Sequence, residues 1–457
     1  TQLTDGLALK NDVISDAAIV EQQHGEFLPE HDDRRIVLEI LDAGLLGLGS
    51  LGLPHHNWQV DVLTVQAGAY PTTDPGLQKA VPPSVRVHRT PALDPYALYA
   101  RLKGARSTKD AIPAGSFDPN AASWTERLAR WIRANIFLPD ARIGWWPFAV
   151  GRGIRLLRRH RYDAILTSGA PHSVHCIGHT LHRFSSTPWV ADLHDPWTDI
   201  GFYDELPHTD FARRLDAALE RRVLQTATRV TTVSPSWKQL FASKGATVGP
   251  VVENGFAPAD FRTLDVAVRR DRFVISHVGT LYANRNPMAL WDALAVLQSR
   301  EALPTLELQL VGRVAPVVEQ ALRERGLWHC TTVVPFVPHR TALRYMAESA
   351  LLLLCIEPFQ VDAGMITSKL YEYLATERPV IGIGPPNGDA AALLRQHNAG
   401  TMVARDDART AEQMLKTHHD AWIRGTPVSG AQRTALSTHT RPRQAQRMAR
   451  VLSAIAS

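Results

Sequence analysis

The sequence predicts an α/β protein that contains two parallel, helix-wrapped sheets. From about Val60 onward, short apolar runs alternate with amphipathic segments of helical length, which is typical of strands joined by helical crossovers. These units form two series, separated by a charged stretch that contains proline. The chain has 457 residues, which is more than one hydrophobic core usually organises. We therefore expect two domains that bind ligands beyond the carboxyl ends of their strands.

The first series is assigned to a domain over residues 35–257. Gly, Pro, Ser or Asp residues flank each of its expected strands. The expected strands are Val60–Val65, Val85–His88, Asp163–Thr167, Trp189–Leu193 and Arg229–Val233. Before them, Arg35–Leu41 fits a strand and Gly44–Leu53 a glycine-rich loop, but too few residues follow for a helix. Residues 1–34 are polar and acidic, without the basic-then-apolar order of a secretory signal, and we expect a divergent, disordered extension there.

The second series is more regular and is assigned to a domain over residues 273–430, after a linker at 258–272. Its expected strands are Phe273–Val278, Leu306–Val311, Thr332–Phe336, Leu351–Ile356, Val380–Ile383 and Thr401–Val403. Helix-length segments fill each gap, which predicts right-handed crossovers in a doubly wound sheet. Residues 431–457 are expected to form one or two basic terminal helices.

The composition is that of a soluble globular protein, with 45% hydrophobic and 21% charged residues. Cys176, Cys330 and Cys355 are widely spaced, which favours a reducing cytoplasm over a disulfide framework or a cysteine metal site. No apolar run approaches the roughly 20 residues of a membrane-spanning helix. A net charge of +5 favours anionic partners, but charge alone does not choose among nucleic acid, membrane surfaces and phosphorylated substrates.

Several segments place glycine, histidine and charged residues where predicted strands end. They are LTSGAPHSVHCIGHTLH (Leu166–His182), PWVADLHDPWTD (Pro188–Asp199), TTVSPSW (Thr231–Trp237), VVENGF (Val251–Phe256), SHVGTLYANRNP (Ser276–Pro287), LVGR (Leu310–Arg313) and SKLYEYLATERPVIGIGPPNGDAAALL (Ser368–Leu394). In this order they resemble the glycosyltransferase family 4 group of GT-B enzymes, over roughly residues 139 to 425. The resemblance implies two facing Rossmann-like domains with a cleft between them. It also implies a nucleotide-diphosphate sugar as donor substrate, retention of anomeric configuration, no bound metal ion and no further cofactor.

The donor side is expected on the helix that carries Lys369 and Glu372. In the family, a carboxylate at the position of Glu372 accepts hydrogen bonds from the nucleotide ribose, and Ser368 lies at the helix N-terminus, whose backbone N–H groups suit a diphosphate. The alternative is a solvated helix face. Gly364 stands where many relatives have a glutamate, and Glu357 or Asp362 is considered as its substitute.

Positive charge is expected near the diphosphate, because this leaving group gains negative charge as the donor bond breaks. Gly279 allows close backbone approach after a strand, and Arg285 matches a family position near the diphosphate. Arg313 follows the next strand. For both arginines the alternative role is a surface ion pair.

The acceptor side is expected at the ends of two strands of the first domain. Ser168, Gly169 and His172 form a strand-to-helix turn in which Ser173 is a candidate helix cap. His194 and Asp195 follow the next strand and are proposed as the polar pair that orients or deprotonates the acceptor hydroxyl. Together with Arg285 they are the expected catalytic residues. The alternative for His172 and His194 is packing, and Asp192 is expected to be buried and structural.

A basic, aromatic segment extends from Trp124 to Arg161. It holds nine arginines from Arg127 onward and one acidic residue in that span, Asp140. The spacing predicts two amphipathic helices that present aromatic residues at an anionic lipid surface and so bring the protein to a lipid-linked acceptor. The alternative is that this segment packs in the first domain with solvated arginines.

The leading hypothesis is therefore a cytoplasmic, peripherally membrane-bound glycosyltransferase. It acts on glycan, glycolipid or small-molecule acceptors in the assembly of surface polysaccharide or glycolipid, and nucleic acid is not an expected partner. The first alternative is a nucleotide-sugar-binding relative without turnover, because the glycine-rich loop is divergent. The second is an epimerase of nucleotide sugars with the same fold.

Overall fold

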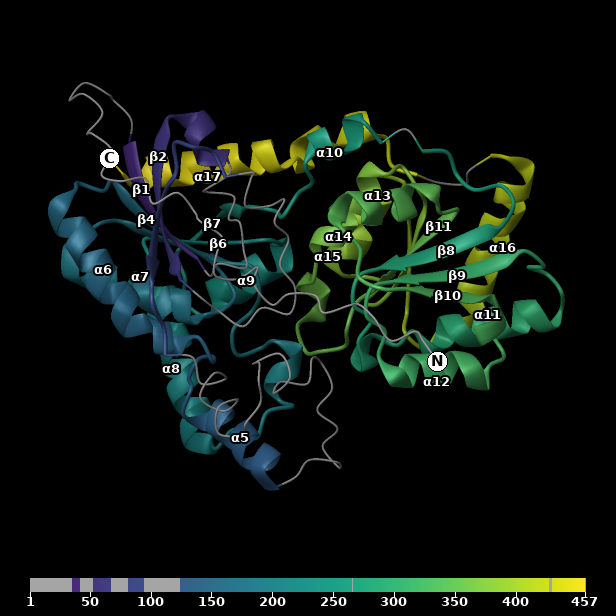
Figure 1. The fold of residues 1–457 in the computed structure, drawn as a ribbon, viewed down its shortest axis with the longest axis horizontal. Helices are drawn as coiled ribbons and strands as arrows, with labels where there is room; N and C mark the ends of the chain where they lie inside the picture. Colours follow the sequence, from purple (N-terminus) through teal and green to yellow (C-terminus); the bar gives the residue numbers. More distant parts are fainter. Residues whose placement is uncertain are drawn as a thin grey trace, which may run out of the picture. The chain divides into compact units, whose positions relative to one another are not determined.

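A computed structural model describes residues 35–41, 52–66, 81–93, 124–264, 266–426 and 430–456. Within these residues the chain forms two parallel sheets with helices on both sides (Figure 1), so the expected α/β class is confirmed. Residues 1–34, expected to be a disordered extension, lie outside the described residues. So does most of the glycine-rich stretch Gly44–Leu53. No helix in the described ranges is long and apolar enough to cross a membrane.

The first sheet has seven strands in the order β3-β2-β1-β4-β5-β6-β7, and its paired strands are all parallel. The strands are β1 (Arg35–Ile40), β2 (Trp58–Val65), β3 (Arg86–Thr90), β4 (Ala164–Gly169), β5 (Trp189–Leu193), β6 (Arg229–Thr232) and β7 (Val248–Val251). The order reverses between β1 and β4, the switch point of a doubly wound sheet. The 3-10 helix η1 (Leu53–His56) directly precedes β2.

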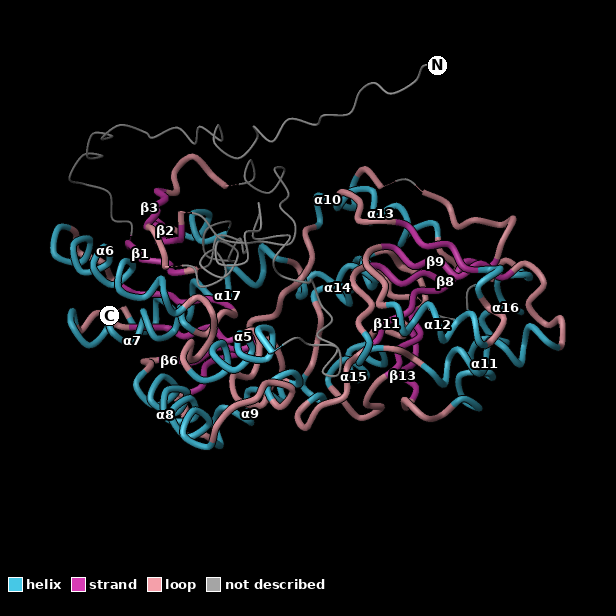
Figure 2. The backbone as a smooth tube through the Cα atoms, turned by 60° about the horizontal axis from the view of Figure 1, so that its bottom comes forward, coloured by secondary structure: helices cyan, strands magenta, loops and turns pink. Residues whose placement is uncertain are grey.

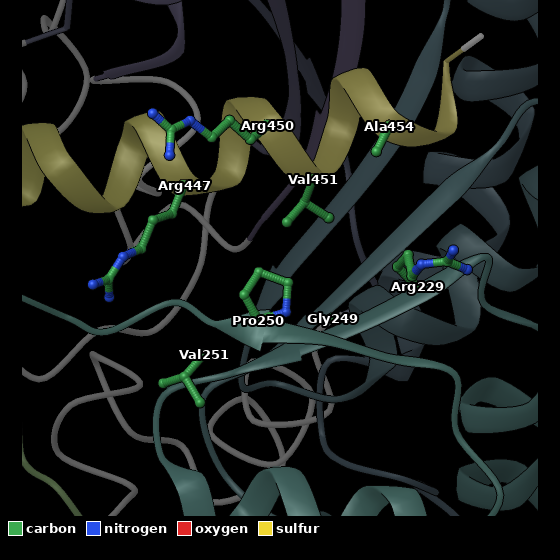
Figure 3. Close-up of a pocket in the computed structure, with 8 residues that line it drawn as sticks. All are labelled: Arg229, Gly249, Pro250, Val251, Arg447, Arg450, Val451 and Ala454. Atoms are coloured by element: carbon green, nitrogen blue, oxygen red, sulfur yellow. The ribbon is translucent and has the colours of Figure 1, made fainter.

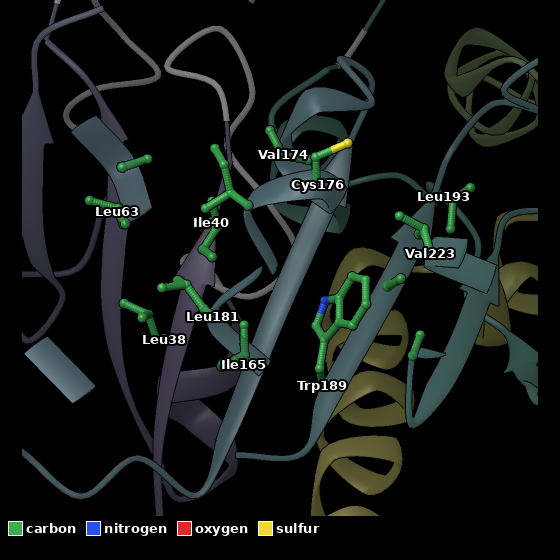
Figure 4. Packing of buried hydrophobic residues seen from close by; sticks show 14 of the residues in the cluster. Leu38, Ile40, Leu63, Ile165, Val174, Cys176, Leu181, Trp189, Leu193 and Val223 are labelled. Carbon is green, nitrogen blue, oxygen red and sulfur yellow. The ribbon is translucent and has the colours of Figure 1, made fainter. Parts of the chain in front are cut away.

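Successive side chains of each strand point to opposite faces of the first sheet, so the two faces pack against different helices. Leu38 and Ile165 face a core shared with α6 (Trp146–Arg159), α7 (Ser173–Ser185), α8 (Asp210–Thr226) and α9 (Pro235–Ser243). Figure 4 shows Trp189 among these side chains, and it is fully buried. Val37 faces the opposite side, where the C-terminal helix α17 (Arg441–Ile455) packs through Leu452.

The second sheet has six parallel strands in the order β10-β9-β8-β11-β12-β13. They are β8 (Phe273–Val278), β9 (Leu306–Val311), β10 (Thr331–Val334), β11 (Leu351–Cys355), β12 (Val380–Ile383) and β13 (Gly400–Val403). One face is covered by α11 (Met288–Ser299), α12 (Pro316–Glu324) and α16 (Ala408–Arg424), the other by α13 (His339–Glu348), α14 (Ser368–Ala375) and α15 (Asp389–Gln396). Figure 2 shows the strands of this sheet between the helices. All the strands expected in this half are present, with ends that differ by a few residues.

The chain passes twice between the two sheets, and the two passages pair with each other. Phe256 N donates to His439 O at 3.1 Å, and Arg441 N donates to Phe256 O at 2.8 Å. Gly255 adopts a φ of 61°, and a Cβ there would lie 2.7 Å from His439 O. The stretch expected as a linker contains α10 (Pro258–Arg262), and η7 (Arg433–His439) leads into α17. The terminal helix thus returns to the first sheet.

Candidate active site

Most of the expected site residues lie just beyond the carboxyl ends of strands. Ser168 and Gly169 end β4, and His194 follows β5. Gly279 follows β8 and Arg313 follows β9. In parallel sheets this edge holds the ligand sites, because loops there diverge from the strand ends and expose backbone and side-chain groups.

His194 is paired with Asp192 in a small polar cluster. Its Nε2 lies 2.9 Å from Asp192 Oδ2 and 3.2 Å from Ser168 Oγ, and Thr231 Oγ1 donates to Asp192 Oδ1 at 2.6 Å. Burial opposes charge on the His194 ring, but the charge of Asp192 and the hydrogen bond to it raise the pKa of His194 above its ordinary value. Asp192 is buried as expected, and its carboxylate also contacts the ring of His194.

Asp195 responds to charges of the second half of the chain. Burial raises the pKa of its carboxyl above the ordinary value. The charge of Glu357 acts in the same direction, whereas His194 and Arg285 oppose the shift. Asp195 therefore links the electrostatics of the expected acceptor side to those of the donor side.

His172 packs against an aromatic ring and does not carry a charge. Its imidazole is stacked on Trp197, with ring centroids 4.8 Å apart and an interplanar angle of 8°. Burial lowers its pKa well below the ordinary value, and Nδ1 has no hydrogen-bond partner among the described residues. His172 itself occupies the N-cap position of α7, so the expected cap at Ser173 was wrong. Asp140 Oδ2 accepts from Ser173 N at 2.8 Å instead.

On the donor side, Gly279 and Lys369 are in close contact. Gly279 has a φ of 116°, and a Cβ there would lie 2.7 Å from Lys369 Nζ. Burial, together with the charge of Arg285, lowers the pKa of Lys369 to about 8. A desolvated ammonium group beside an open glycine backbone is suited to bind an anion.

Arg285 forms a largely buried ion pair with Glu357. Arg285 Nε donates to Glu357 Oε2 at 2.9 Å, and the two side chains are 15% and 10% exposed. The guanidinium also lies over the ring of Tyr282, 5.4 Å from its centroid. The Nε edge of Arg285 is thus occupied by a carboxylate. Arg313 is exposed.

The other carboxylate considered at this site, Asp362, pairs with a residue that the sequence did not single out. Arg405 Nη2 donates to Asp362 Oδ2 at 2.5 Å and to the carbonyl oxygens of Ile356 and Glu357 at 3.2 and 3.0 Å. Arg405 follows β13, so its place at the carboxyl end of an expected strand could have marked it.

Gly364 has no room for a side chain, which gives a physical reason for the missing glutamate. A Cβ at Gly364 would lie 2.3 Å from Cδ1 of Trp237 on α9. Trp237 Nε1 also donates to Val361 O at 3.0 Å. The indole therefore occupies the space that a side chain at this position requires.

Glu372 lies on α14, whose first residue is Ser368. Glu372 Oε1 is 3.0 Å from His339 Nε2 and 3.8 Å from an Nη atom of Arg441. The carboxylate is 13% exposed, so it is not a freely solvated helix face. Among the described residues, no group of three or more His, Cys, Asp or Glu side chains is arranged to hold a metal ion.

A hollow of about 620 Å³ lies elsewhere, between α17 and the edge strand β7 (Figure 3). Arg229, Arg447 and Arg450 line it, but their guanidinium groups point in different directions (Figure 3). None of the expected site residues lines this hollow. The candidate site is therefore defined by the strand ends and not by this cavity.

Comparison with known proteins gives one family match, to part of the chain. Residues 50–255 match the family described as "Glycosyl transferase 4-like domain". No curated protein sequence matches the chain.

Solved structures match nearly the whole chain in fold. Sucrose-phosphate synthase from Thermosynechococcus elongatus is 17% identical, with a TM-score of 0.54, and the match covers 93% of this chain and 96% of that one. A UDP-forming trehalose-phosphate synthase from Burkholderia xenovorans is 12% identical, with a TM-score of 0.57 and coverage of 93% and 100%. WaaG, a glycosyltransferase involved in lipopolysaccharide biosynthesis, is 13% identical, with a TM-score of 0.55 and coverage of 92% and 99%.

At these identities the structures establish the fold, and the family match spans β2 to β7 of the first sheet but not β1. The expected GT-B architecture is confirmed. The chain thus has the GT-B fold, and its residues 50–255 match the model of a glycosyl transferase 4-like domain.

Proposed function

We propose that the protein transfers a sugar from a nucleoside-diphosphate donor to a glycan or lipid-linked acceptor, with retention of configuration and without a metal ion. The observation that carries this proposal is the position of Lys369. Its buried ammonium group abuts the backbone of Gly279, and the same helix carries Glu372 one turn later. A cation for phosphate and a carboxylate for ribose hydroxyls on one helix fit a nucleoside diphosphate.

The departing diphosphate would be stabilised by Lys369 and Arg285. Lys369 remains mostly protonated at neutral pH, because its lowered pKa is about 8. A diphosphate would supply the anionic partner that this desolvated cation favours. The backbone N–H groups at the start of α14, near Ser368, would add hydrogen bonds to the same oxygens.

On the acceptor side, a proton on His194 Nε2 would be held by the carboxylate of Asp192, whose Oδ2 lies 2.9 Å away. His194 would act as a positive, hydrogen-bonding group that orients substrate and stabilises negative charge, rather than as a free base. Asp195 would orient the acceptor hydroxyl. In a retaining mechanism without a covalent nucleophile, that hydroxyl attacks from the face that the diphosphate leaves, and its proton passes to a diphosphate oxygen.

Calorimetric titration with UDP, GDP and ADP tests the donor site. UDP is the first choice because the trehalose-phosphate synthase of similar fold is UDP-forming. We expect one nucleotide to bind and Glu372→Ala to weaken it by about 10- to 100-fold, the value of a hydrogen bond to a charged group. Glu324→Ala, an exposed position at the end of α12, is the matched control and should bind as the wild type does. Absence of binding to all three nucleotides would refute the donor site.

Turnover separates the transferase from the two alternatives. The cognate UDP-, GDP- or ADP-sugar is incubated with EDTA, and the released nucleotide and the anomeric proton of the product are followed by NMR. Transfer or slow hydrolysis that retains the anomer supports the proposal. Tight binding with no release of nucleotide would favour a binding protein, and inversion at a ring carbon of the intact nucleotide sugar would favour an epimerase.

Peripheral membrane contact through α5 (Trp124–Asn135) is a second part of the proposal. Trp124, Leu128 and Trp131 follow helical spacing on one face and are 70%, 48% and 44% exposed. Arg127 is exposed beside them. By contrast, Trp145 is buried, and its Nε1 donates to Thr90 Oγ1 at 2.7 Å, so this part of the basic segment packs in the first domain. Exposed indoles next to arginines suit an anionic lipid interface.

Vesicle co-sedimentation tests this contact. We expect binding to vesicles that contain phosphatidylglycerol, weaker binding to phosphatidylcholine alone, and loss of binding in the double variant Trp124→Ala/Trp131→Ala. Phe184→Ala removes an aromatic side chain that is 71% exposed on α7, and it should bind normally. Equal sedimentation of the double variant and the wild type would contradict the role of α5.

A further inference from the structure

The carboxylate of Glu372 has its two oxygens in different surroundings. His339 Nε2 lies 3.0 Å from Oε1, and an Nη atom of Arg441 lies 3.8 Å from the same oxygen. Both contacts hold one side of the carboxylate and leave Oε2 for another hydrogen-bond donor. Because a glutamate side chain has several rotatable bonds, such a hold determines where Oε2 is presented.

His339 is the first residue of α13 and reaches Glu372 on the neighbouring helix α14. Its side chain is 39% exposed, so solvent protons reach it. Three charged groups face the imidazole: Glu372 from α14, Asp260 from α10, with Oδ2 4.0 Å from Nδ1, and Arg441 from the start of α17. The ring thus lies between two carboxylates, and one arginine acts against its charge.

We propose that His339 is a positioning residue for the nucleotide, whose imidazole holds Glu372 by Oε1 so that Oε2 accepts hydrogen bonds from the ribose hydroxyls. The inference rests on the proposed donor site and adds a residue to it. His339 does not contact the nucleotide in this arrangement. Its contribution passes through Glu372, and it should therefore depend on the ribose hydroxyls.

The arrangement also predicts how nucleotide affinity changes with pH. The hydrogen bond to Glu372 raises the pKa of His339 above its ordinary value, the charges of Glu372 and Asp260 add to this effect, and burial and Arg441 oppose it. The protonated ring makes the stronger, charge-assisted bond to Glu372. As the pH rises through the raised pKa, this bond weakens, so the contribution of His339 to affinity is largest below it and falls above it.

The experiment compares the nucleotide that the wild type binds with its 2′,3′-dideoxy form, by calorimetry at several pH values. We expect His339→Ala to weaken binding of the full nucleotide about tenfold, which corresponds to about 1.4 kcal/mol. Binding of the dideoxy form should be unchanged. His339→Gln keeps an N–H donor that does not titrate, so it should restore most of the affinity near pH 8.

The ratio of wild-type to His339→Gln affinity isolates the titration of His339, because the nucleotide and Lys369 titrate in both proteins. This ratio should fall as the pH rises from 6 to 8. His329→Ala, an exposed histidine of the 3-10 helix η5 (Trp328–Cys330), is the matched control and should bind as the wild type does.

Combination with Glu372→Ala distinguishes positioning from a general structural role. In that background His339→Ala should cause no further loss, because the group that it holds is gone. An equal loss for the dideoxy nucleotide, or a full tenfold loss in the Glu372→Ala background, would overturn the inference while the donor site stands. A wild-type protein that binds none of the three nucleoside diphosphates would overturn the donor site itself, and this inference with it.

Discussion

Replacement of Lys369 by methionine should make the protein more stable and less able to bind nucleotide. The change keeps most of the side-chain volume and removes the buried ammonium group. Its pKa is lowered from 10.5 to about 8, a shift that corresponds to about 3 kcal/mol against the charged form. This cost is present at pH 7.5, where the lysine is charged both folded and unfolded, and it disappears as the pH rises from about 8 to 10.5. We therefore expect Lys369→Met to raise the free energy of unfolding by about 1–3 kcal/mol at pH 7.5.

Nucleotide binding should change in the opposite direction. Loss of a charge-assisted bond to a diphosphate costs about 1.5–3 kcal/mol, which is roughly a 10- to 150-fold weaker affinity. Denaturant unfolding without nucleotide measures the first effect, and calorimetric titration measures the second. Lys416→Met, at an exposed position of α16, should change neither. If Lys369→Met destabilises the protein and binds nucleotide normally, Lys369 is a structural residue and the assignment of the phosphate site is wrong.

Two further predictions concern packing and pH. Gly364→Ala places a Cβ 2.3 Å from Trp237, so it should lower the free energy of unfolding by about 1–3 kcal/mol, measured with denaturant. The same substitution should cost less in a Trp237→Leu background. An unchanged stability of Gly364→Ala would show that the indole can move at no cost. His418 has its pKa lowered to about 4 by burial, so the unfolded chain binds its proton first and stability should fall as the pH drops from 6.5 toward 4. His418→Gln should reduce this fall by up to about 2 kcal/mol, measured as the difference in unfolding free energy between pH 7 and pH 5, and an unchanged slope would contradict the assignment.

Local sequence patterns were sufficient for most of the fold. Continuous apolar runs predicted the strands of the second sheet, because strands buried on both faces exclude polar residues. The edge strand β7 was not expected, since Gly249 and Pro250 interrupt its pattern and an edge position tolerates both. The amphipathic period of α17 predicted a helix but not the sheet on which it packs. That choice depends on Leu452 meeting Val37, more than 400 residues away along the chain.

The sequence proposed residues for the candidate site but did not indicate how they pair. Motif positions indicated Lys369 and Glu372, because their chemistry fits phosphate and ribose. They did not indicate His339, which lies 33 residues before Glu372 and approaches it only through the packing of two helices. The same holds for Arg405, 43 residues from its partner Asp362. Pairings of this kind depend on which helices cover one face of the sheet, and periodicity does not encode that.

The arrangement of charge gives a reason why donor and acceptor sides would act together. Arg285 is neutralised by Glu357 at 2.9 Å, whereas Lys369 beside it is desolvated without an equivalent bond to a carboxylate among the described residues. An incoming diphosphate would pair with Lys369 and compete with Glu357 for Arg285. Both changes alter the field at Asp195, whose pKa already depends on Glu357 and Arg285. Donor binding would thereby reset the protonation of the residue proposed to orient the acceptor, so the pH dependence of Asp195 should differ between the empty and the nucleotide-bound protein.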